Sequence, residues 1–563
     1  MKSKVTRLIC VILAVILVAV SFSSCSGKEK LIDFIYPFSA DVNSFDPQVA
    51  ATSDEYLIIE NTFEGLIRMD DEGNVQKGVA ESWEISDDGL NYTFHLKKGL
   101  KWNINTEKYD EGEKKGEYKD ERLRMLGYEF NPDITAHDFV FALQRAVSPE
   151  TQCPMFSSVS SIENASAIYS GKMSRDKLGV SAPDDYTLTI KLAYPDSSFM
   201  ETLTSAVAMP CNEEFFNATK GRYGLLTKFS LFNGQFYLSQ ILESSYLLKK
   251  NESYLGEFPA SAGELTLKIT DEEDKTVDKL ISGYYDAAFI KGTDSSKVLR
   301  SGSITTHPYS NTTWALQFNT KTSVVFTNKT MRKAFCLGLA QPEKFDEDYL
   351  SSATAITPPS CKIGANNALE AMGATVAKQN QKESIKLWKK GLKDFDITEF
   401  RIKIITTPEL ENGLKQVLQG VQSGIGSVVR NGDDDKIYTV FEIKTMSEAE
   451  IKNAKIKGDY DIALCPFRAT SDSAVSFLRA TGENSGGYNK KKLEKSLVSA
   501  EKAADINTKT KFVREAEGRI IGSYSLYPVI YETGYYVEAK GVEGVQFHMG
   551  TGRVSFVNAT RKE

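Results

Sequence analysis

Two hairpin patterns in residues 61–94 constrain the fold of this chain more than any other stretch does. Apolar segments alternate there with tight turns at 71–74 and 87–89. Each turn contains an acidic residue followed by glycine, which supplies the positive φ that tight hairpin turns need. After the second turn, apolar and polar residues alternate, as in a strand with one buried face. The stretch therefore predicts a pair of β-hairpins, and it contains no residue pattern typical of catalysis.

The chain is too long to fold around one compact core. Its 563 residues predict about two to four domains. An apolar fraction of 41% and a charged fraction of 25% are those of an ordinary globular protein. In the second half, a strand pattern at 400–406 is followed by a helix pattern at 413–429, which predicts an α/β lobe. A similar turn-and-strand phrase at 283–289 and 458–464 suggests that two lobes share this construction.

The first residues have the pattern of a secretion signal. Three basic residues precede an apolar run at 8–20, and small residues then lead to Cys25. The run is shorter than the roughly 20 apolar residues that span a bilayer, so 1–24 is predicted to be a cleaved signal peptide. The end of the run resembles a bacterial lipobox, although Phe22 stands where leucine is usual. We expect lipidated Cys25 to anchor the chain on the extracytoplasmic face of the cell membrane, the alternative being an ordinary signal with an incidental cysteine.

Charge and motif content disfavour several classes of function. Residues 1–24 contain three basic and no acidic residues, so their removal changes the net charge from −7 to −10. A surface this acidic argues against nucleic-acid binding. The sequence has no HExxH, P-loop or GxSxG pattern, and its four histidines are far apart. We therefore expect no enzyme, no metal centre and no cofactor, and we expect the five cysteines after Cys25 to be mostly buried thiols.

A series of short motifs runs along the chain in a fixed order. They read Asn-Ser-Phe-Asp-Pro at 43–47, Phe-Glu-Gly-Leu at 63–66, Ala-Glu-Ser-Trp at 80–83, Thr-Ala-His-Asp-Phe at 135–139, Asn-Gly-Gln-Phe at 233–236, Asn-Glu-Ser-Tyr at 251–254 and Met-Arg-Lys-Ala at 331–334. Together they resemble the family 5 extracellular solute-binding proteins, the peptide and nickel receptors of bacterial ABC importers. The family has only a few residues where this chain has the charged segment 103–131, which looks like an insertion and is expected to be a solvated surface loop.

The resemblance implies an α/β fold of the periplasmic-binding-protein-like type II, with two hinged α/β lobes and an extra β-rich domain. It divides the chain after the signal into lobe I at 25–60, 178–290 and 531–563, the extra β-rich domain at 61–177, and lobe II at 291–530. The hairpins at 61–94 would then lie in the extra domain, away from the solute. The implied protein is a monomer that captures an oligopeptide between closing lobes and delivers it to an ABC permease.

The resemblance also implies residues that face the solute. Ala51, Thr52 and Ser53 follow the Asp-Pro motif, where the family places a strand edge against the bound peptide. Tyr488 and Tyr531 are expected to add aromatic walls to the site.

A second group of expected site residues lies in one segment, Phe467, Arg468, Thr470 and Asp472. In the family, an aspartate in this segment holds the α-ammonium of the peptide through a charge-assisted hydrogen bond. Thr470 occupies the aspartate position here, so Asp472 is the candidate replacement, whereas Arg468 would suit an anionic group. The alternatives are a nickel chelate, haem, an oligosaccharide or a modified peptide as solute, or a surface protein that signals without transport.

Overall fold

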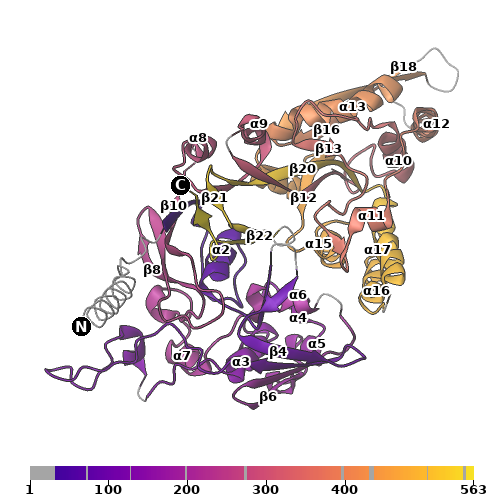
Figure 1. The fold of residues 1–563 in the computed structure, drawn as a ribbon. Coiled ribbons are helices and arrows are strands. Elements are labelled where there is room, and N and C mark those ends of the chain that lie inside the picture. The colour runs from indigo at the N-terminus through magenta and orange to yellow at the C-terminus, as the bar shows by residue number, and fades with distance from the viewer. Residues whose placement is uncertain are drawn as a thin grey trace, which may run out of the picture.

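Three large sheets organise the chain, which is seen here in a computed structural model (Figure 1). The structure describes residues 32–70, 74–126, 129–196, 199–271, 275–302, 304–394, 398–429, 436–503, 505–548 and 553–562. Two of the sheets have four strands and the third has eight. Within the described ranges, no helix is long and apolar enough to cross a membrane.

The first sheet joins the start of the described chain to its middle. Its order is β1 (Ile32–Phe38), β10 (Ala262–Ile269), β9 (Ser245–Lys250) and β8 (Phe236–Leu242). β1 pairs with β10 in parallel, and the other two pairs are antiparallel. Every second residue of β1 from Phe34 to Phe38 is buried, as expected for a strand whose side chains point alternately to the two faces of the sheet.

Both predicted hairpins are confirmed, the first as a separate two-stranded sheet and the second as part of the second four-stranded sheet. β2 (Ile67–Met69) pairs with β3 (Val75–Lys77), and β4 (Ala80–Ile85) pairs with β5 (Asn91–Leu96). Gly89 has a φ of 68° in the turn between β4 and β5, which a residue with a side chain rarely adopts. The sheet is completed by β7 (Thr187–Lys191) and β6 (Val180–Asp184). Strand pairing thus runs across the expected division at 177/178.

The third sheet forms the centre of lobe II. Its order is β11 (Ala287–Ile290), β20 (Leu526–Glu538), β12 (Thr305–Phe318), β19 (Ile462–Arg468), β16 (Glu399–Thr406), β18 (Lys436–Thr445) and β17 (Ser427–Val429), with β13 (Leu350–Ser352) also paired to β20. The single long strand β20 runs across the expected division at 530/531.

Two groups of helices accompany this sheet. α10 (Lys329–Gly338), α12 (Gln381–Gly391) and α13 (Glu411–Ile425) contact one another, and α15 (Ala474–Asn484), α16 (Lys490–Glu501) and α17 (Ile506–Ile521) form the second group (Figure 1). The helix predicted over 413–429 was wrong at its end. It stops at Ile425, and 427–429 forms β17 because two consecutive valines favour a strand after Gly426.

The two four-stranded sheets share one continuous hydrophobic core. Phe34 of β1, Phe94 of β5 and Phe556 near the C-terminus are fully buried in the same cluster. We call this unit the N-terminal body. Lobe II has its own apolar clusters, which include Trp388 and Leu478. The two bodies meet at a small apolar contact, where Ala287, Tyr309 and Tyr536 of the lobe II sheet pack in the cluster of the N-terminal body.

The charged insertion is more ordered than a solvated loop. Its described residues, 103–126 and 129–131, project from the body at the lower left of Figure 1. An isolated bridge joins Lys108 to Tyr118, so part of the segment forms a narrow loop. Leu123, Leu126 and Phe130 are buried and anchor its base. The expectation of a solvated loop holds for the tip and was wrong for the base, because the charge pattern hides three apolar side chains.

Candidate functional site

A cavity of about 280 Å³ lies between the N-terminal body and lobe II. From the N-terminal body, its walls include Ala51 and residues of α4 (Phe156–Val159) and α6 (Phe199–Thr202). From lobe II, they include residues 470–473 and the start of α15. In Figure 1, α4 and α6 lie opposite α15. Because both bodies supply walls, closing or opening the hinge changes the cavity directly.

The first group of expected residues reaches the cavity only through Ala51. Thr52 is the N-cap of α2 (Ser53–Thr62), and Ser53 is the first residue of that helix. The backbone N–H groups of Ala51 and Thr52 donate to the carboxylate of Glu55 at 2.6 and 3.0 Å. Burial acts to raise the pKa of Glu55, but four backbone hydrogen bonds outweigh burial and lower it. These two N–H groups are therefore already occupied.

Thr470 and Asp472 line the cavity, whereas Phe467 and Arg468 are not among its lining residues. Phe467 lies in β19 with only 8% of its surface exposed. The guanidinium of Arg468 donates to both carboxylate oxygens of Glu448 at 2.9 and 2.5 Å. Its charge is therefore neutralised within lobe II and is not offered to an anionic solute.

The two expected aromatic walls have structural contacts instead. The hydroxyl of Tyr531 accepts a hydrogen bond from the Ala355 N–H at 2.9 Å and donates to the Ala355 carbonyl at 3.0 Å. The hydroxyl of Tyr488 donates to the Gly482 carbonyl at 2.9 Å. Neither tyrosine is among the cavity-lining residues. The tyrosines alone could not reveal that these hydroxyls bind backbone carbonyl groups.

Asp472 meets an acid that the sequence did not reveal. It is only 4% exposed, and one of its carboxylate oxygens lies 3.2 Å from Lys362 Nζ. Across the cavity, its side chain shares a hydrogen bond with Glu201 of α6. Burial, followed by the hydrogen bond and charge of Asp472, raises the pKa of Glu201 to about 8. Glu201 lies in the stretch Phe-Met-Glu-Thr, which has no pattern that marks a binding residue.

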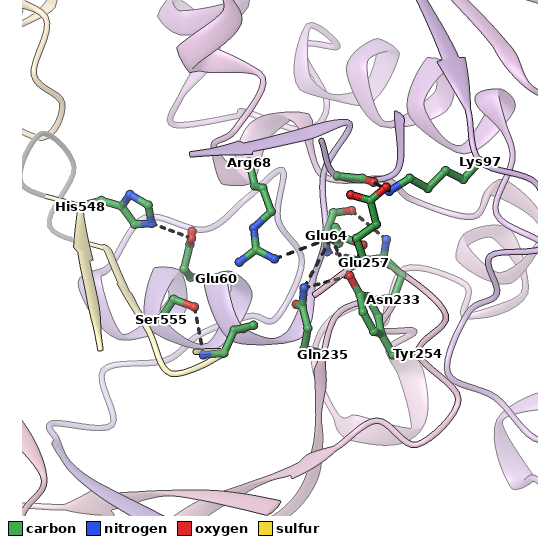
Figure 2. A network of polar contacts seen from close by, with 12 residues as sticks. Glu60, Glu64, Arg68, Lys97, Asn233, Gln235, Tyr254, Glu257, His548 and Ser555 are labelled. Carbon is green, nitrogen blue, oxygen red and sulfur yellow. Dashed lines mark hydrogen bonds and ion pairs between the residues drawn. The ribbon is translucent and has the colours of Figure 1, made fainter. Parts of the chain in front are cut away.

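Arg553 enters the cavity wall from the C-terminal segment. Its Nη1 lies 3.0 Å from Glu60 of α2, and it also donates to the carbonyl of Thr204. Figure 2 shows His548 pointing to the same Glu60, with Nε2 3.3 Å from Oε1. Burial acts to raise the pKa of Glu60, but Arg553 and His548 outweigh burial and bring the pKa to about 2. This network fixes Arg553 at the edge of the cavity.

A neighbouring network shows what three of the sequence motifs do (Figure 2). Asn233 donates to the Glu64 carbonyl at 2.8 Å and accepts from the Glu64 N–H at 3.0 Å. Tyr254 donates to the Glu64 carboxylate, at 2.8 and 2.9 Å from its two oxygens. The motifs at 63–66, 233–236 and 251–254 therefore lock together inside the N-terminal body. They hold the scaffold, and none of these three residues lines the cavity.

The cavity presents charges of both signs. Its acids are Asp196, Glu201, Asp472 and Glu501, and its bases are Lys509 and Arg553. Over the part of the chain that the structure describes, no group of three or more His, Cys, Asp or Glu could hold a metal ion. The arrangement suits a polar solute held by hydrogen bonds and ion pairs.

The chain was compared with known proteins. It is 22% identical to the "Dipeptide-binding protein" of Lactococcus lactis subsp. cremoris over 578 residues, covering 97% of both chains. It is 25% identical to the "Oligopeptide-binding protein OppA" of Bacillus subtilis, covering 92% of this chain and 90% of that protein. The solved structure of Listeria monocytogenes OppA bound to peptide superposes with a TM-score of 0.70 at 20% identity, covering 95% of this chain and all of that one.

These likenesses confirm the fold expected from the sequence, two α/β lobes with an additional β-rich sheet. The family model for bacterial extracellular solute-binding proteins, family 5 Middle, matches residues 74–489. That match covers more than half of the chain and includes the hairpin β4–β5 and most of lobe II. The chain belongs to family 5 of the bacterial extracellular solute-binding proteins.

Proposed function

We propose that this protein is a lipid-anchored receptor of an ABC importer, which captures a short peptide between its two bodies and delivers it to the permease. The observation that carries the proposal is the cavity with walls from both bodies, Ala51 on one side and Thr470 and Asp472 on the other. Members of this family are binding proteins and not enzymes.

The size and chemistry of the cavity favour a short peptide. Its volume of about 280 Å³ is close to the lower end of the roughly 300–1,000 Å³ typical of ligand sites. The relatives named above are dipeptide- and oligopeptide-binding proteins. Serines at 157, 158, 160 and 205 also line the cavity and offer hydroxyl groups that can bind a peptide backbone without selecting its sequence.

Native mass spectrometry of the purified protein, followed by calorimetry with a pool of short random peptides, tests the proposal. We expect a co-purified peptide, and saturable binding after it has been removed by unfolding and refolding. Co-purification of a chelate, haem or oligosaccharide, with no peptide binding, would replace the proposed solute. Peptide binding without uptake in cells that carry the permease would point to a signalling role.

The lipid anchor is tested separately. The signal-like segment 1–24 and Cys25 lie outside the described residues, so the proposal of an anchored monomer rests on the sequence pattern. We expect metabolic labelling with a fatty acid to mark the wild type and not Cys25→Ser. We also expect Cys25→Ser to leave the membrane fraction. Equal labelling of both forms would contradict lipidation at Cys25.

A further inference from the structure

The side chains of Glu201 and Asp472 meet where the two bodies face each other. Glu201 comes from α6 of the N-terminal body, and Asp472 comes from the loop that precedes α15 of lobe II. Both line the cavity, and their carboxyl groups are hydrogen-bonded to each other. Two carboxyl groups can form such a bond only when at least one of them carries a proton.

The charges around this pair balance one carboxylate and not two. Lys362 of lobe II lies 3.2 Å from Asp472 and compensates its charge. Arg553, on the same body as Glu201, is already paired with Glu60 at 3.0 Å. Across the cavity wall, Glu501 is paired with Arg479 at 2.8 Å, and Asp196 and Lys509 also line the wall. A proton on Glu201 therefore leaves the pair and Lys362 electrically neutral, whereas its loss would leave one negative charge.

We propose that Glu201 and Asp472 together receive a primary ammonium group of the solute, an inference that rests on the proposed function. The ammonium replaces the proton that the two carboxyl groups share. On binding, Glu201 releases one proton to solvent and the ammonium supplies one positive charge, so the site stays neutral. Asp472 was expected at the ammonium from the family resemblance. Glu201, on the opposite body, is the new member, and it makes binding a one-for-one exchange of a proton for an organic cation.

The geometry favours an ammonium over a divalent metal ion. Lys362 places a positive charge 3.2 Å from one carboxylate, which repels a doubly charged ion. An ammonium has three N–H donors and can donate to carboxylates on both bodies at once. It would thereby bridge the bodies and favour their closed arrangement. The ammonium can be the amino terminus of a peptide or a lysine side chain, and the experiment separates these sources.

The test uses three synthetic tripeptides: trialanine, N-acetyl-trialanine and N-acetyl-Ala-Lys-Ala. Calorimetry in two buffers with different heats of ionisation, at about pH 7, measures the protons released per peptide bound. We expect about one proton from the wild type with trialanine and almost none from Glu201→Gln. N-acetyl-trialanine should bind at least about tenfold more weakly and release none. Release with N-acetyl-Ala-Lys-Ala would assign the site to a lysine side chain.

The pH dependence gives a second readout. Because the ammonium competes with a proton, the ratio of wild-type affinity to that of Glu201→Gln should rise about tenfold per pH unit up to about pH 8 and level off above it. The affinity of Glu201→Gln should stay flat below about pH 7 and fall above about pH 8, because the peptide amine itself then loses its proton. The matched control is Glu163→Gln, which removes an acid paired with Lys191 at 2.7 Å outside the cavity and should release protons like the wild type. Equal proton release by wild type and Glu201→Gln would overturn the proposal.

A readout without peptide separates this inference from the proposed function. The difference between the infrared spectra of the ligand-free wild type and Glu201→Gln should contain a protonated-carboxyl band at about pH 7 that disappears by about pH 9. Other buried carboxyls, such as Asp138, whose pKa burial raises to about 7, occur in both proteins and cancel in the difference. If no peptide binds and the band is present, the proposed peptide capture is wrong, whereas the shared proton is supported. If peptides bind and the band is missing from the wild type, the exchange is wrong and the receptor function stands.

Discussion

Replacing Glu60 with glutamine should remove a buried electrostatic link between α2 and the C-terminal segment. The Glu60 side chain is only 14% exposed, and Arg553 and His548 lie 3.0 and 3.3 Å from its two oxygens. Glutamine keeps the size of the side chain and loses its charge. The variant therefore measures what the charge contributes, with little change in packing.

The magnitude follows from the pKa of Glu60. A pKa lowered from 4.5 to about 2 in the folded protein stabilises it by about 3 kcal/mol at neutral pH. This contribution is present above the unfolded pKa of 4.5 and is lost as the pH falls through about 2. Loss of one partner from a buried ion pair costs about 3–5 kcal/mol, which agrees. At about pH 3, roughly 1.5 kcal/mol of the difference should remain.

Urea unfolding of both proteins, monitored by tryptophan fluorescence at several pH values, measures this difference. The control is Glu543→Gln, which breaks an exposed pair with Lys562 at 2.6 Å in the same segment. It should cost less than about 1 kcal/mol. A cost for Glu60→Gln that equals the control at neutral pH, or that does not shrink in acid, would refute the reasoning.

Three further predictions concern groups away from the cavity. Arg145→Met should lower the free energy of unfolding by about 3–5 kcal/mol in urea titrations, because it leaves Asp46 buried without its partner; a cost below about 1 kcal/mol would contradict this. Tyr531→Phe should lower the free energy of unfolding by about 1–2 kcal/mol, because its backbone hydrogen bonds are lost, and should leave the peptide Kd unchanged. Weaker peptide binding by this variant would show that Tyr531 contributes to the site. The five cysteines that the structure describes should resist iodoacetamide in the native protein at about pH 8 and react in urea, because all of them are buried. Burial raises the pKa of Cys153 to about 11 and that of Cys211 to about 12. Rapid labelling of the native protein would contradict their burial.

The sequence predicted best those elements whose partners are close along the chain. The hairpin β4–β5 needs only two neighbouring strands and the turn at Gly89, and all three are visible in one short stretch. The ends of elements were less certain, as in α13, where residues 427–429 leave the helix for the edge of a sheet.

The candidate site could be predicted only in part, because its contacts join distant segments. Family motifs pointed to Ala51, Thr470 and Asp472, and these residues do line one cavity. They could not show that Glu201 faces Asp472, since nothing in either stretch specifies the other. The same limit applies to Arg468, because nothing in the sequence around it shows that Glu448 lies beside its guanidinium.

The shared core of the N-terminal body sets an order of events during biosynthesis. Asn61 of α2 donates to the Val554 carbonyl at 2.9 Å and accepts from the Phe556 N–H at 2.8 Å, and Phe556 is fully buried against β1. A chain that emerges amino terminus first therefore leaves α2 and β1 without these neighbours until residues 554–556 have appeared. Lobe II, whose sheet uses strands between Ala287 and Glu538, has its full set of strands earlier. The half of the protein that is made first is therefore the half whose last native contacts become available latest.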